Sequence, residues 1–120
     1  IPATTLDLPG VQGGWFAMPD PASTGAFRSQ YDAAYGGQPH PIGSLAFDGM
    51  AAIGALIKSG ESDPLSTAAI TQGAGFKGAN GVFRLLADGT NERGLAIATI
   101  RDKKVVIINN APTGFSGAGF

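Results

Sequence analysis

The chain has 120 residues, a length that fits one small domain or part of a larger one. Its net charge of −1 excludes the basic surface that nucleic acids or anionic membranes attract, and the lack of cysteine excludes disulfides, thiolate catalysis and zinc–thiolate sites. Charged residues make up 14% of the chain, against about 25% in an average globular protein. This low share indicates apolar surface in need of cover, so we expect self-association or a remnant of a longer protein.

The first half of the chain predicts one strand and two helices. Residues 11–18 are typical of a strand interrupted by two glycines. Asp20 and Pro21 have the pattern of a helix N-cap followed by proline, and helical spacing of apolar residues extends this helix to a left-handed cap at Gly36. A second helix is expected over residues 43–59, and its wide apolar face predicts that it is largely buried.

The second half predicts a short helix and three strands. Asp63 and Pro64 repeat the cap-then-proline pattern and open a helix that ends near Gln72. Strands are expected over residues 82–87, 95–101 and 105–109, with turns at 88–91 and 101–104. Residues 111–120 are rich in glycine, which predicts a flexible tail. The resulting order β-α-α-α-β-β-β is that of an α/β fold.

The turn before the first of these strands predicts the strand's register. We expect Gly81 to take positive φ and to set the angle at which the strand begins. Alternation then directs Phe83 and Leu85 toward the core and leaves Arg84 outward for solvent or a partner.

These elements, over residues 8–112, resemble the C-terminal part of a type I periplasmic-binding-protein fold. The residues that carry the resemblance are, in chain order, Tyr35 and Gly36, Pro41, Phe47 and Asp48, residues 76–81, Phe83 and Arg84, and Asp88 and Gly89. Phe47 stands where such proteins commonly have tyrosine. The resemblance implies a two-lobe α/β fold with a cleft between the lobes. Residues 1–120 would then be a partial domain, the C-terminal segment of that fold.

Within this superfamily the chain is most similar to the penicillin-binding protein activators of the bacterial envelope. Residues 15–21, 78–81 and 91–95 carry this similarity. It implies a non-catalytic regulator of peptidoglycan synthesis that is periplasmic, is lipid-anchored through a missing N-terminal region and has a penicillin-binding protein as its partner. The alternative is a solute-binding receptor that delivers amino acids or related small molecules to the permease of an ABC transporter. An unrelated hydrolase is disfavoured because the chain offers no nucleophile–base pair.

Five residues are candidates for ligand binding. Trp15, Phe16 and Met18 end the first strand, where ligands gather in α/β sheets, although alternate side chains there would also pack under the first helix. Phe47 and Asp48 lie on the second helix. Because Asp48 is a carboxylate on an otherwise apolar helix, we expect it to be hydrogen-bonded or to contact a ligand.

The remaining polar residues give weaker indications. Arg84 and Arg93 are expected to contact a partner or an anionic ligand, or to lie on a solvated face. His40 is the only histidine and stands between two prolines, which favours a surface role over a metal ligand or a base. Asp20 and Asp63 have the spacing of helix caps. We therefore expect no catalytic residue, no metal, no cofactor and no enzymatic activity.

Overall fold

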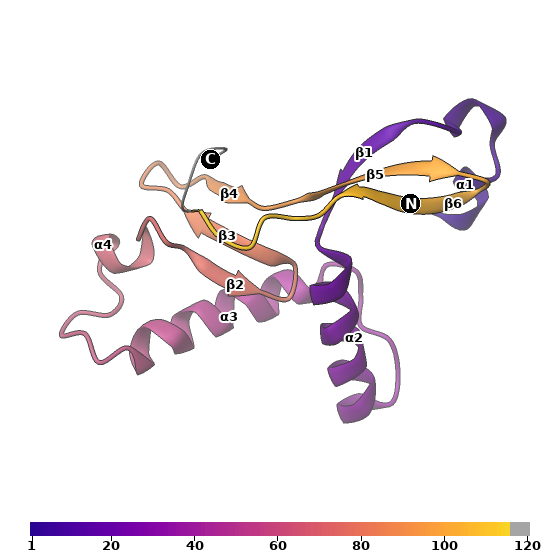
Figure 1. Ribbon diagram of the computed structural model, residues 1–120. Helices are drawn as coiled ribbons and strands as arrows, with labels where there is room; N and C mark the ends of the chain where they lie inside the picture. Colours follow the sequence, from indigo (N-terminus) through magenta and orange to yellow (C-terminus); the bar gives the residue numbers. More distant parts are fainter. Residues whose placement is uncertain (116–120) are drawn as a thin grey trace.

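The computed structural model describes residues 1–115, which form two small antiparallel sheets with the strand orders β1-β5-β6 and β2-β3-β4 (Figure 1). The strands are β1 Trp15–Met18, β2 Phe76–Gly78, β3 Gly81–Leu85, β4 Asn91–Arg93, β5 Ala96–Arg101 and β6 Lys104–Asn109. Only Gly94 and Leu95 separate β4 from β5, so one nearly continuous segment belongs to both sheets.

The helices are α1 Ala3–Leu6, the 3₁₀ turn η1 Pro9–Val11, α2 Pro21–Tyr35, α3 Gly43–Lys58 and α4 Thr67–Ile70. The α3 helix lies along the second sheet and contacts β2, whereas α2 extends from the region where the two sheets meet (Figure 1). Within residues 1–115, no helix combines the length and the hydrophobicity that a membrane crossing requires.

The mixed helix and sheet architecture confirms the predicted fold class, and the long helices start and end close to where the sequence places them. Gly36 ends α2 with a φ of 70°, in the left-handed region, as expected. The predicted start of the short helix at Asp63 is wrong. The hydroxyl of Ser66 accepts a hydrogen bond from the Ala69 N–H at 3.2 Å, so α4 begins three residues later. The sequence did not predict α1, η1, β2 or β4, each of four residues or fewer.

The prediction that the second helix is largely buried is wrong. The buried positions of α3 form a single stripe at intervals of four residues, namely Ser44, Asp48, Ala52 and Leu56. Most of the large apolar side chains lie outside this stripe, where Met50 is 69% exposed and Ile57 is 58% exposed. Apart from Leu56, the buried stripe consists of small or polar residues, and β2 approaches it closely at Gly78. The described residues therefore leave the apolar face of α3 largely uncovered.

The core is narrow and follows β5. Ala96 and Ala98 are fully buried and Ile100 is nearly so, because β5 is the central strand of its sheet. The radius of gyration is 16.7 Å, compared with about 14 Å expected for a compact domain of this length. The chain is thus more open than a compact domain, consistent with the low share of charged residues.

Gly81 has a φ of +97°, which confirms the predicted positive value. Phe83 is buried and Leu85 half-buried, as alternation predicted, but Val82 on the other face is buried as well. It packs so closely on Gly94 that a β-carbon there would lie 2.7 Å from Val82 Cγ2. Both faces of β3 are therefore covered.

Arg84 is outward-facing but engaged. Its Nη2 lies 2.5 Å from Oε2 of Glu92 on the neighbouring strand, and its Nη1 donates a hydrogen bond to the Gly73 carbonyl at 3.2 Å. The guanidinium carbon also lies 4.8 Å from the centre of the Phe115 ring. Phe115 is buried, so residues 111–115 of the predicted tail end against the sheet, and residues 116–120 lie outside the described part of the chain.

Both predicted turns form. In the first, the hydroxyl and N–H of Thr90 donate hydrogen bonds to the Asp88 carboxylate at 2.6 and 2.9 Å, and these bonds lower the pKa of Asp88. In the second, Asp102 and Lys103 have φ values of 50° and 64° and connect β5 to β6 in a two-residue hairpin. Such turns favour glycine or asparagine, so Lys103 is held in a backbone conformation that strains its β-carbon.

This strain predicts that Lys103→Gly raises the stability of the chain by about 1 kcal/mol. The backbone N–H of Lys103, which donates to the Gln12 side chain at 3.1 Å, is kept in the variant. The matched control is Lys104→Gly. Lys104 follows Lys103 directly and lies in β6, where glycine lowers stability. Urea unfolding of the two variants should give shifts of opposite sign, and equal losses of stability would contradict the prediction.

Candidate functional site

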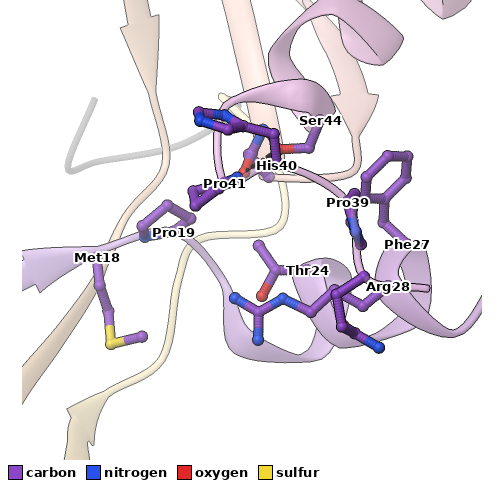
Figure 2. Close-up of a pocket in the computed structure, with 11 residues that line it drawn as sticks. Met18, Pro19, Thr24, Phe27, Arg28, Pro39, His40, Pro41 and Ser44 are labelled. Carbon is purple, nitrogen blue, oxygen red and sulfur yellow. Dashed lines mark hydrogen bonds between the residues drawn. The ribbon is translucent and has the colours of Figure 1, made fainter. Parts of the chain in front are cut away.

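A groove of about 320 Å³ opens at the end of β1 (Figure 2). Its walls come from β1, from the first half of α2, from the connector that precedes α3, from the first turn of α3 and from the β2–β3 turn. The lining residues are Met18, Pro19, Thr24, Phe27, Arg28, Gln38, Pro39, His40, Pro41, Ser44 and Asn80. The volume lies at the small end of the range of about 300–1,000 Å³ that ligand pockets occupy.

The start of α2 determines which side chains enter the groove. Asp20 caps the helix: its carboxylate accepts hydrogen bonds from the Ala22 N–H at 3.1 Å and from the Ser23 hydroxyl at 2.8 Å. Thr24, Phe27 and Arg28 follow at helical spacing and therefore share one face of α2. That face lines the groove.

The connector between α2 and α3 forms the opposite rim. Pro39 and Pro41 restrict its backbone on either side of His40. Nδ1 of His40 accepts a hydrogen bond from the Ile42 N–H at 3.3 Å. In the neutral ring this leaves Nε2 as the N–H donor. His40, which the sequence assigned to a surface role, is indeed exposed, and it also lines the groove.

Beneath the groove, Ser44, Asp48 and Asn80 form a buried hydrogen-bond network. Asp48 is 1% exposed, and its carboxylate accepts bonds from the Ala79 N–H at 2.5 Å and from the Asn80 N–H and Nδ2 at 3.3 Å each. The Asn80 amide also exchanges bonds with the Ser44 hydroxyl at 2.9 and 3.1 Å. Within the described residues, no buried side-chain polar atom lacks a partner.

Gly78 makes this network possible. A β-carbon at that position would overlap the Asp48 carboxylate, so only glycine lets the helix and the strand come this close. The network ties α3 to the β2–β3 turn, and Ser44 and Asn80 form the floor of the groove. These contacts support the hydrogen-bonded role predicted for Asp48 over a direct ligand contact.

The other predicted ligand-binding residues are divided between the groove and its surroundings. Met18 lines the groove, and Phe16 is half-buried on the same face of β1. Trp15 points to the opposite face and is 76% exposed, outside the groove. Phe47 does not line the groove either, but its ring centre lies 5.1 Å from that of Phe27 and so supports the wall from behind.

The two arginines predicted to meet a partner lie in the second sheet and do not line the groove. Arg84 is held by Glu92, and Arg93 lies over the ring of Phe83 at 5.1 Å. Within residues 1–115, no three His, Asp or Glu side chains come close enough together to hold a metal ion.

Sequence reasoning did not single out Arg28, Thr24, Gln38 or Asn80 for the groove. The spacing of Ser44 and Asp48, one turn apart on an apolar helix, was a signal that could have revealed a polar stripe. Thr24 and Arg28 have the same one-turn spacing on the first predicted helix. Gln38 and Asn80 carry no comparable local pattern, because they lie in a connector and a turn.

No family model and no curated protein matches the sequence. A solved structure from Rhodospirillum rubrum, described as that of a branched-chain amino acid ABC transporter, is similar with a TM-score of 0.72 and 18% identity. The similarity covers 90% of this chain and 34% of the Rhodospirillum chain. A leucine-binding protein from Thermotoga maritima matches over 82% of this chain and 31% of its own, at 16% identity and a TM-score of 0.48, too low to support an argument.

The first match establishes the fold. The chain has the architecture of part of a type I periplasmic-binding-protein-like fold, and it spans about a third of the length of the structure that it matches. The Rhodospirillum structure is not described as a penicillin-binding protein activator, so the more specific prediction of an activator has no support from this comparison.

The buried network predicts a large loss of stability for Asp48→Ala. The change leaves the N–H groups of Ala79 and Asn80 buried without an acceptor, at a cost of roughly 3 kcal/mol or more. Asp32→Ala is the matched control, since Asp32 is exposed on α2 and its side chain has no hydrogen bond or ion pair among the described residues. Thermal unfolding should separate the two variants, and similar melting temperatures would contradict the role given to Asp48.

Proposed function

We propose that the chain is part of a solute-binding protein of an ABC transporter, and that the groove at the end of β1 takes a small organic molecule such as an amino acid or a related compound. The observation that carries this proposal is the groove itself. It combines an apolar wall with a few polar groups that converge from different elements, the usual composition of a small-molecule site.

The architecture supports the same interpretation. The structural match from Rhodospirillum rubrum is described as a branched-chain amino acid ABC transporter. In a two-lobe fold a ligand lies in the cleft between the lobes, and this chain corresponds to 34% of that match. The groove would then be one wall of the cleft, with the opposite wall supplied by residues outside this chain. A permease would be the protein partner, and the periplasm would be the location.

The hydrogen bonds at the groove support a binding role for its polar residues. Ser44 and Asn80 bond each other, and Asp48 bonds the backbone, so the groove offers hydrogen-bond donors and acceptors without an activated nucleophile. A regulator of the penicillin-binding protein activator type is not proposed, because no contact or groove described here favours it.

The test is a titration of the ¹⁵N-labelled 120-residue chain with amino acids, organic acids and sugars at millimolar concentrations, followed by amide chemical shifts. Because the groove is open on one side, we expect weak binding with shifts confined to residues 18–28, residues 38–44 and Asn80. Thr24→Trp fills the groove and should abolish these shifts.

Ser29→Trp provides the control, since it adds the same ring at an exposed α2 position that does not line the groove. It should bind like the unaltered chain. A panel in which no compound perturbs the groove residues, or in which Thr24→Trp binds unchanged, would exclude the proposed function.

A further inference from the structure

We infer that the groove selects solutes with a carboxylate and an apolar body but no ammonium group, and that Arg28 pairs with the carboxylate. The inference rests on the proposed function and specifies its ligand class. Three properties of the groove support it. Its ionisable lining residues are basic, Arg28 forms no ion pair within residues 1–115, and its walls are largely apolar.

The charged and titratable residues that line the groove are all basic. They are Arg28 and His40, and within residues 1–115 no aspartate or glutamate lines the groove. Two carboxylates lie close to the groove without lining it, and both are already hydrogen-bonded. Asp48 lies beneath the floor, where it is 1% exposed and accepts three hydrogen bonds. Asp20 caps α2 and accepts hydrogen bonds from the Ala22 N–H and the Ser23 hydroxyl. A free amino acid would bring an ammonium group that finds no carboxylate here, next to a guanidinium that repels it. An acid without that group avoids this cost.

Arg28 is available for an anionic ligand. Within residues 1–115 the only ion pair joins Arg84 to Glu92, and Asp32, one turn further along α2, forms none with Arg28. The Arg28 side chain reaches past Thr24 toward the part of the groove where Met18 lies (Figure 2). A guanidinium presents paired N–H donors whose geometry matches the two oxygens of a carboxylate. Nε2 of His40 at the rim offers a further donor.

The composition of the walls predicts that the remainder of the ligand is apolar. Met18, Phe27, Pro39 and Pro41 present apolar surface around the polar groups. Phe27 is backed by Phe47, which gives the groove an aromatic wall against which a ring can pack. A small aromatic or aliphatic carboxylic acid satisfies both the walls and Arg28.

A series of phenyl compounds that differ in one group tests the inference: 3-phenylpropanoate, L-phenylalanine, L-phenylalanine amide and 3-phenylpropanol. Dissociation constants for the 120-residue chain come from amide chemical shifts. We expect 3-phenylpropanoate to bind at least about fivefold more tightly than the other three compounds. Arg28→Gln should lower its affinity to that of the alcohol, and Arg28→Lys should restore part of it.

Arg101→Gln is the matched control, because Arg101 is exposed at the end of β5 and does not line the groove. Its affinities should equal those of the unaltered chain. L-Phenylalanine binding as tightly as the acid, or Arg28→Gln binding the acid unchanged, would overturn the inference while leaving the proposed function intact. If none of the four compounds, and none of the wider panel of amino acids, organic acids and sugars, perturbs the groove, both the inference and the proposed function fail.

Discussion

The hydrogen bonds from the Ala79 and Asn80 backbone to the Asp48 carboxylate are the contact on which the rest of the structure depends. A carboxylate excluded from water is costly unless donors surround it, and the turn between β2 and β3 supplies them. Gly78 leaves the space that the carboxylate occupies. Once this contact forms, the orientation of α3 is fixed. Ser44 then lies at the floor of the groove, and most of the large apolar side chains of the helix stay exposed.

The second constraint is the segment that β4 and β5 share. Its first part, β4, pairs with β3 in one sheet, and its second part, β5, pairs with β1 and β6 in the other, so this segment joins the two sheets. The groove forms where β1 ends and α2 begins, and Asn80 of the other sheet's β2–β3 turn is part of its floor. The exposed apolar face of α3 and the radius of gyration of 16.7 Å reflect the same open arrangement. The small share of charged residues in the sequence is consistent with this exposed apolar surface.

Features with a local cause could be predicted from the sequence. Asp20 caps α2, Gly36 ends it and Gly81 takes positive φ, since each of these depends on neighbouring residues alone. The buried face of α3 could not be predicted, because the sequence shows which side chains are apolar and not which side the sheet approaches. The same limit applies to the site. Met18 followed from its place at a strand end, whereas Asn80 reaches the groove through contacts with residues more than thirty positions away.

The residues that hold the groove together differ from those that give it charge. Ser44, Asp48 and Asn80 are buried and satisfy one another, so none can change without loss of the contact between helix and sheet. Arg28 and His40 are exposed and contribute little to packing. A chain of this fold can therefore alter the charge of its groove without altering its scaffold. For that reason a likeness in architecture at 18% identity does not by itself transfer a ligand, and the charge of the lining residues is the better guide to what this groove binds.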